Sequence, residues 1–180
     1  MSGAYNNRRD NYMRTIRTKV YKFDELNEAA KQTALTKFWA INVDFGDWYY
    51  SVYDNAKNIG LEITSFDIDR QQIDGELNNS MTETCDKIIA NHGEVCETYK
   101  TAQEYMSQLR AYNTIEDGDK AGDYEAEIEE LESDFLKAIL EDYLIILRKE
   151  YEYLTSEQAI KETIEANEYE FTKDGKQFNR

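Results

Sequence analysis

The chain has 180 residues, of which 41% are hydrophobic and 13% aromatic, a composition typical of a folded domain rather than of a disordered chain. Its net charge of −16 opposes long-range attraction to nucleic acid and to anionic membranes, and it favours basic partners. The charge is uneven, because residues 1–22 carry a net +5 and residues 23–180 therefore carry −21.

Length and composition also predict the class of protein. No apolar run is long enough for a membrane span, and the polar start lacks the apolar centre of a signal peptide. The only cysteines, Cys85 and Cys96, are expected to be reduced thiols inside a cell. Residues 1–14 are predicted to be a flexible basic tail, and residues 15–180 a single domain.

The first predicted elements are a strand and a helix. Residues 15–23 combine β-branched and aromatic side chains and predict a strand. Asp24 follows as an expected N-cap, so that a helix is predicted over 24–41. Its apolar residues recur at helical spacing.

A second helix and a second strand follow. Asp47 is expected to cap this helix, and Gly60 to end it in the left-handed conformation. Residues 61–70 predict a strand whose apolar positions change face near Thr64–Ser65, which indicates a β-bulge. Residues 71–80 contain glycine and asparagine and predict a turn-rich segment.

Two more helices are predicted in the middle of the chain. Ser80 and Glu83 have the capping-box spacing, and Gly93 is an expected stop. A further helix is predicted over 97–113, followed by a polar, glycine-containing loop over 114–123.

The longest predicted helix spans 124–154 and has two different halves. Its first half is acidic, and a narrow stripe of Ile128, Leu131 and Phe135 is its only apolar side. Its second half is apolar around most of its circumference, which predicts burial.

The C-terminal segment is predicted to form a helix and a hairpin. Thr155 and Gln158 have the capping-box spacing before a helix over 156–167, and the Asp174–Gly175 pair predicts a hairpin turn. We therefore predict an α+β fold, with about six helices around one long central helix and a small, mostly antiparallel sheet.

The residue pattern gives little support for a metal site or a catalytic site. Cys85, His92 and Cys96 could supply zinc ligands, but there is no close pair of cysteines and no second histidine. Asp67 and Asp69 share a strand face in the prediction and could hold magnesium in a nuclease, although Arg70 is the only base nearby. We expect neither an enzyme nor a cofactor.

The acidic run before and within the long helix is the strongest candidate for function. Residues 116–134 carry ten acids and one base. On a helix, Glu127, Glu130 and Asp134 align beside the apolar stripe, and like charges one turn apart cost a few tenths of a kcal/mol per pair. Helix turns rise about 5.4 Å and phosphates follow one another at roughly 6–7 Å, so that carboxylates can approximate a phosphate row.

This pattern has two interpretations. One is a solvated helix face beside a flexible loop. The other is a surface that binds a basic groove, and the fourteen tyrosines favour it because tyrosine is enriched where proteins meet partners. The predicted partner-binding residues are Glu116, Asp117, Asp119, Asp123, Tyr124, Glu127, Glu130 and Asp134.

Four segments resemble a family of small acidic proteins from phages and prophages of low-GC bacteria: residues 20–34, 57–70, 88–102 and 140–175. Members are often labelled antitoxin-like, and the chain is also similar to type II-A anti-CRISPR proteins, which inhibit Cas9. The resemblance implies a non-catalytic inhibitor of host defence, located in the cytoplasm of an infected bacterium. It supplies no functional residues.

Three functional hypotheses follow. The first is a phage-encoded anti-CRISPR protein that binds Cas9 with its guide RNA and blocks DNA engagement by partial DNA mimicry, without itself binding duplex DNA or a membrane. The second is an antitoxin that neutralises a basic toxin. The third is a metal-dependent nuclease that uses Asp67 and Asp69 to cleave guide RNA or DNA.

Overall fold

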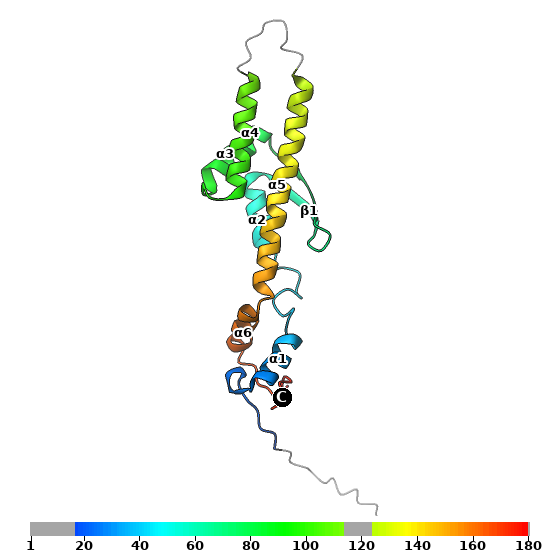
Figure 1. Cartoon of the computed structure of the whole chain (residues 1–180), viewed down its shortest axis with the longest axis vertical. Helices are drawn as coiled ribbons and strands as arrows, with labels where there is room; N and C mark the ends of the chain where they lie inside the picture. Colours follow the sequence, from blue (N-terminus) through cyan, green and yellow to red (C-terminus); the bar gives the residue numbers. More distant parts are fainter. Residues whose placement is uncertain (1–16, 114–123, 180) are drawn as a thin grey trace, which may run out of the picture. The chain divides into compact units, whose positions relative to one another are not determined.

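The computed structural model describes residues 17–113 and 124–179, which form six α-helices, one 3-10 helix and a two-stranded antiparallel sheet (Figure 1). The predicted α+β class with one dominant helix is confirmed. The described chain divides into two compact units, residues 39–160 and residues 17–38 with 161–179. Because such units need not fold independently, the single domain over 15–180 stays a prediction, and the predicted tail over 1–14 lies outside the described residues.

The first helix of the larger unit is α2 (Tyr50–Ile59), which leads directly into the sheet. Gly60 ends α2 with φ +88°, the left-handed conformation that was predicted. The start differs from the prediction, because α2 begins three residues after Asp47 and the residue before it is Tyr49. Residues 48 and 49 instead form a turn that points their rings into an aromatic cluster.

The sheet consists of β1 (Leu61–Asp67) and β2 (Gln72–Leu77). Their register shifts between Ile63 and Ser65, which confirms the predicted bulge. The turn-rich interpretation of 71–80 was wrong for most of that segment, because residues 72–77 form β2. Gly75 serves close packing here: a Cβ at this position would lie 2.6 Å from the Glu62 carbonyl oxygen and 2.9 Å from Leu140 Cδ2.

Two helices follow the sheet close to their predicted positions. Ser80 caps α3 (Met81–Asn91), since its Oγ accepts a hydrogen bond from the backbone N–H of Glu83 at 3.2 Å. The helix predicted over 97–113 is confirmed as α4 (Glu97–Asn113). The predicted loop over 114–123 lies outside the described residues.

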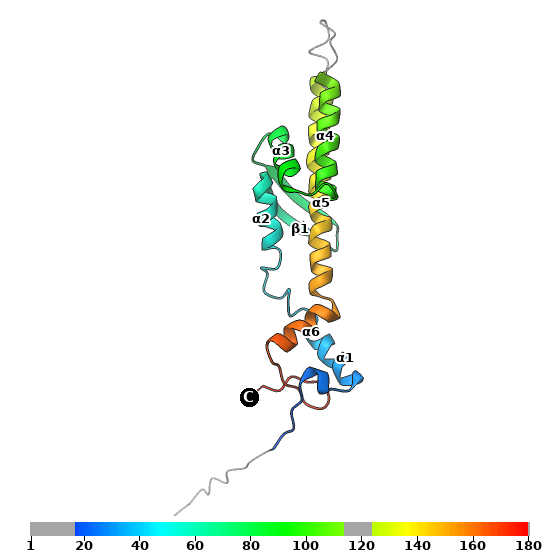
Figure 2. The same ribbon diagram turned by 90° about the vertical axis from the view of Figure 1, so that its left-hand side faces the viewer.

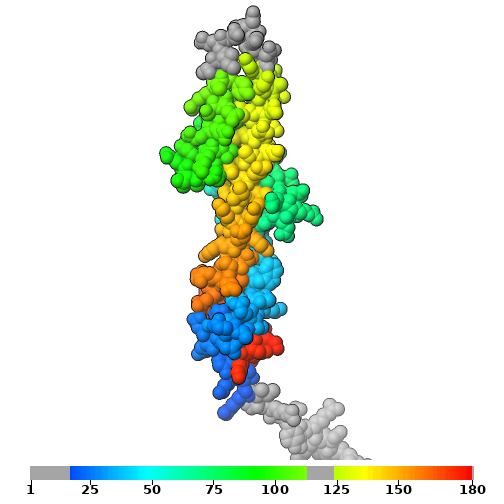
Figure 3. All heavy atoms as spheres, in the orientation of Figure 1, coloured from blue at the N-terminus to red at the C-terminus, as the bar shows by residue number. Residues whose placement is uncertain are grey.

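The long helix is confirmed as α5 (Glu125–Leu154), and it supplies much of the core of the larger unit. Figures 1 and 2 show α4 alongside only the first part of α5, and the face in Figure 3 leaves much of α5 at the surface. Tyr143 is fully buried, and its hydroxyl donates a 2.7 Å hydrogen bond to Asn55 Oδ1. The prediction that the whole second half is buried was wrong, because Ile145 and Ile146 are 38% and 37% exposed.

The last helix, α6 (Glu157–Ala166), begins one residue later than predicted. Ser156 is its cap, since Ser156 Oγ accepts from the backbone N–H of Ala159 at 3.2 Å. The expected capping role of Thr155 was wrong, because its hydroxyl donates to the Tyr151 carbonyl at the end of α5. No helix in the described ranges is both long and apolar enough to cross a bilayer.

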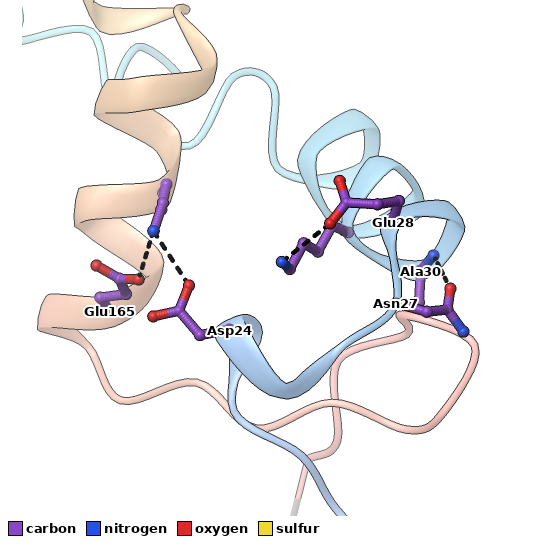
Figure 4. A network of polar contacts seen from close by, with 7 residues as sticks. Asp24, Asn27, Glu28, Ala30 and Glu165 are labelled. Carbon is purple, nitrogen blue, oxygen red and sulfur yellow. Dashed lines mark hydrogen bonds and ion pairs between the residues drawn. The ribbon is translucent and has the colours of Figure 1, made fainter.

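In the smaller unit, α1 (Glu28–Lys37) is capped by Asn27, whose Oδ1 accepts from the backbone N–H of Ala30 at 3.0 Å (Figure 4). The expectation that Asp24 caps this helix was wrong. Asp24 lies in the 3-10 helix η1 (Phe23–Glu25), where its carboxylate forms a 3.1 Å ion pair with Lys161. The extended residue that follows η1 interrupts the helical path.

The strand predicted over 15–23 was wrong for its described part, where only Tyr21 forms a bridge, to Phe171. Phe171 also bridges Gln177 around the turn at Gly175, so the predicted hairpin is present as single bridges rather than strands. The Phe23 ring lies edge-on to Phe171 with centroids 6.2 Å apart. Aromatic packing therefore adds to the backbone hydrogen bonds that Tyr21 and Phe171 exchange at 2.8 and 2.9 Å.

Candidate partner-binding surface

The acidic half of α5 is anchored by its apolar stripe. Ile128 and Leu131 are half-buried, and Phe135 is buried against Tyr105 of α4, with ring centroids 4.8 Å apart. Buried aromatic pairs of this kind contribute about 0.5–1.5 kcal/mol beyond the area that they bury. The carboxylates on this half therefore project from a packed helix rather than from a loose segment.

Glu127, Glu130 and Asp134 are exposed, as predicted for one face of this helix. Among the described residues, no ion pair or side-chain hydrogen bond reaches any of the three. Some carboxylates elsewhere are neutralised, as in the 2.6 Å pair between Glu97 and Lys100. The three carboxylates therefore present negative charge that nothing in the described chain offsets at short range.

Asp134 also lines a cavity of about 270 Å³ between α4 and α5. The Glu104 carboxylate lies in the same lining and accepts a hydrogen bond from Gln108 Nε2 at 3.3 Å. Burial, together with the nearby Glu132 carboxylate, raises the pKa of Tyr105 to about 12, so its phenol stays protonated at neutral pH. The groove is thus acidic and carries hydroxyl and amide groups that can hydrogen-bond a partner.

The remaining predicted site residues divide into two sets. Tyr124 precedes α5 and lies near Tyr112 at the end of α4, with ring centroids 5.9 Å apart, so it closes the described end of the α4–α5 pair. Glu116, Asp117, Asp119 and Asp123 lie outside the described residues. The structure therefore brings Tyr124 and the acidic row of Glu127, Glu130 and Asp134 onto one helical pair.

The tyrosines near α2 have mainly a structural role. Tyr49 lies within 5.3 Å, centroid to centroid, of both Tyr53 and Phe66, and Trp48 contacts Phe66 and Tyr151. This cluster joins α2, β1 and the end of α5 inside the larger unit. It is core packing more than a binding surface, although Tyr50 and Tyr153 stay exposed.

The cysteine and histidine candidates for a zinc site lie in different environments. Cys85 is buried, and burial raises the pKa of its thiol to about 12, so it is a poor source of thiolate. Cys96 is exposed, and His92 Nδ1 lies 2.7 Å from Thr98 Oγ1. The part of the chain that the structure describes contains no group of three His, Cys, Asp or Glu side chains placed to hold a metal ion.

The expected placement of Asp67 and Asp69 on one strand face was wrong. Asp67 is the last residue of β1, and Asp69 lies in the turn after it. Asp67 Oδ1 accepts a hydrogen bond from the backbone N–H of Arg70 at 2.9 Å, and the Arg70 Nε lies 3.6 Å from its other oxygen. These contacts give Asp67 a role in closing the turn.

The sequence reasoning missed a second set of residues along α5, namely Asp142, Ile145, Ile146 and Lys149. They line a cavity of about 450 Å³ together with Val95 and His92. The signal was present, because positions 142, 145, 146 and 149 have the three-and-four spacing of one helical face. The segment was predicted to be core because nine of the twelve residues at 136–147 are apolar.

Comparison with protein families, with curated proteins and with solved structures gives no match to this chain.

Proposed function

We propose that this protein is a non-catalytic inhibitor that binds the basic nucleic-acid channel of a host defence nuclease of the Cas9 type. The observation that carries the proposal is the acidic row of Glu127, Glu130 and Asp134. The row is exposed, and no described residue neutralises it. It is held on α5 by the buried Phe135.

The geometry suits a channel that normally holds a nucleic-acid backbone. Glu127 and Asp134 are seven residues apart, which corresponds to a rise of about 10.5 Å along the helix. Lysine and arginine side chains that neutralise phosphates can meet carboxylates at similar intervals. Because the row is already ordered on a packed helix, binding costs less conformational entropy than binding of a loose acidic tail would.

The resemblance to anti-CRISPR proteins favours Cas9 with its guide RNA as the enzyme. Cas9-type proteins hold the guide–target heteroduplex in a positively charged channel through its backbone and not through its sequence. An acidic helix in that channel would exclude the target DNA. The protein would then need no catalytic group of its own.

Plasmid cleavage by a purified Cas9–guide complex tests this proposal. The test variant is Glu127→Lys/Glu130→Lys/Asp134→Lys. The control variant Asp54→Lys/Asp86→Lys/Glu152→Lys makes the same change in net charge at three exposed acids outside the row. We expect the test variant to inhibit at least about tenfold more weakly, a change of about 1.4 kcal/mol, and the control variant to inhibit like the wild type.

Two results would contradict the proposal in different ways. Equal inhibition by both variants would show that the acidic row is not the contact surface. Failure of the wild type to bind the Cas9–guide complex would exclude this enzyme class. In that case, rescue of growth in cells that express a small basic toxin from a neighbouring gene would favour the antitoxin hypothesis.

A further inference from the structure

One face of α5 continues beyond the helix that covers it. Residues at alternating spacings of three and four form a single stripe along α5: Ile128, Leu131, Phe135, Ala138, Asp142, Ile145 and Lys149. Leu131, Phe135 and Ala138 line the groove against α4, and Thr101 Oγ1 of α4 donates to Asp142 Oδ2 at 2.7 Å.

α4 begins at Glu97, so its N-terminal end lies close to this hydrogen bond. At 1.5 Å per residue α4 is about 26 Å long and α5 about 45 Å, so α4 cannot cover the whole stripe. The views in Figures 1 and 2 agree that α4 runs beside the first part of α5 only.

The uncovered part of the stripe is an apolar patch with polar ends. Ile145 and Ile146 are exposed on the helix, and Val95 in the turn before α4 is 86% exposed. All three line the cavity of about 450 Å³. An apolar patch with a polar rim, beside the buried residues in the second half of α5, is typical of a docking site.

The polar ends of the patch carry opposite charges. At one end Asp142 is half-buried beside Glu97, and the nearby Lys100 is already paired with Glu97 at 2.6 Å. At the other end lies Lys149, about 10.5 Å further along the helix. The Asp142 end therefore favours a cation, and the Lys149 end disfavours one.

We propose that Val95, Asp142, Ile145, Ile146 and Lys149 form a docking surface for a short amphipathic helix of a protein partner. This helix would continue the path of α4, with branched apolar side chains on the isoleucines and a basic side chain at Asp142. Continuity with the α4–α5 interface determines the axis of this helix, and the charge of Asp142 determines at which end of the patch its basic side chain lies. Two to three helical turns would cover the stripe.

This surface is separate from the acidic row, which lies on the opposite half of α5. It does not depend on the proposed inhibitor function, because any partner with such a helix could use it. Loss of one surface would leave the other intact, so the two proposals can fail independently.

Three synthetic peptides of about 14 residues test the proposal with the ¹⁵N-labelled full chain. The first carries leucines at the spacing i, i+3, i+4, i+7 and lysines on the flank of that stripe. The second replaces the lysines by glutamine, and the third has the composition of the first in scrambled order. We expect the first peptide to shift the backbone amide signals of residues 92–98 and 142–149.

Variants on the patch give the decisive comparison. We expect Ile145→Lys/Ile146→Lys to weaken binding of the lysine peptide at least about tenfold, and Tyr50→Lys, an exposed apolar residue on α2, to leave it unchanged. Val95→Lys gives the same test without disturbing the packing of α5, because Val95 is the most exposed of the three apolar patch residues. Asp142→Asn should remove the preference for lysine over glutamine while apolar binding persists.

The proposal is wrong if the scrambled peptide binds equally well, if the shifts map to residues 125–135, or if Ile145→Lys/Ile146→Lys and Val95→Lys both keep the wild-type affinity. It is also wrong if sedimentation shows a dimer that Ile145→Lys/Ile146→Lys dissociates, since a second copy would then occupy the patch.

Discussion

Neutralising two carboxylates of the acidic row should make the protein more stable and a weaker inhibitor. In Glu130→Gln/Asp134→Asn, two like-charge contacts disappear, between Glu127 and Glu130 at i, i+3 and between Glu130 and Asp134 at i, i+4. Each such pair costs about 0.2–0.5 kcal/mol, and Asp134→Asn also removes an i, i+3 attraction of similar size to Lys137. The free energy of unfolding should therefore rise by a net value of about 0.2–0.5 kcal/mol at low salt. For a chain of this length that corresponds to roughly 0.5–2 °C in Tm.

Urea unfolding at low ionic strength and again in 1 M NaCl measures the gain. The gain should shrink at high salt, where the screening length falls to about 3 Å. The control Asp54→Asn/Glu157→Gln removes two exposed charges that have no carboxylate one turn away on the same helix, and it should give no gain. The same samples are then compared in the plasmid-cleavage assay.

The two readouts separate the two interpretations of the acidic row. If the acidic row is a functional surface, the variant should inhibit less while its free energy of unfolding rises, since functional surfaces are retained at a cost to stability. A gain in stability with unchanged inhibition would identify a solvated face. No gain at low salt would refute the reasoning that these carboxylates repel one another on α5.

Two substitutions test the packing, and one titration tests the pH response. Thr84→Val should raise the free energy of unfolding by about 1 kcal/mol in urea titrations, because the Thr84 hydroxyl is buried without a hydrogen-bond partner in the described chain. Gly75→Ala should lower it by about 1–3 kcal/mol, because the new Cβ would press on Leu140 and on the backbone of β1; an unchanged value would disprove this close packing. Hydrogen bonds from Lys176 and from a nearby threonine hydroxyl lower the pKa of Asp174 to about 2. An NMR titration of the Asp174 carboxyl should therefore show a midpoint at about that pH. The stability that this carboxylate adds should be lost as pH falls from 3.8 towards 2. A midpoint near 3.8 would show that these bonds do not persist in solution.

Local signals in the sequence were sufficient for most helices. The ends of α3 and α2 follow from Ser80 and Gly60, whose side-chain and backbone preferences act over three or four residues. The acidic row was also predictable, because its exposure depends only on helical spacing along α5.

Errors arose where a distant segment decides the outcome. Asp24 has the chemistry of a helix cap, but its carboxylate pairs with Lys161, which is 137 residues away in the chain. Gly75 was predicted to be a turn residue, whereas the Glu62 carbonyl of the paired strand and Leu140 of α5 leave no room for a side chain there. Ile145 and Ile146 looked like core residues, and only the length of α4 relative to α5 leaves them exposed.

The half-buried Asp142 of this stripe should lower the free energy of unfolding measurably at neutral pH. Desolvation by burial raises the pKa of this carboxyl above its ordinary value of 3.8, while the hydrogen bond from Thr101 opposes the rise. The folded state therefore binds the proton more tightly than the unfolded state. The free energy of unfolding should fall as pH rises from about 3.8 through the raised pKa of the folded state. Asp142→Asn keeps an oxygen that can accept from Thr101 and removes the charge. The variant should match the wild type below about pH 3.8 and exceed it in free energy of unfolding at pH 7. Equal stability at both pH values would show that the carboxylate is well solvated, and the argument that it awaits a cationic partner would then lose its energetic basis.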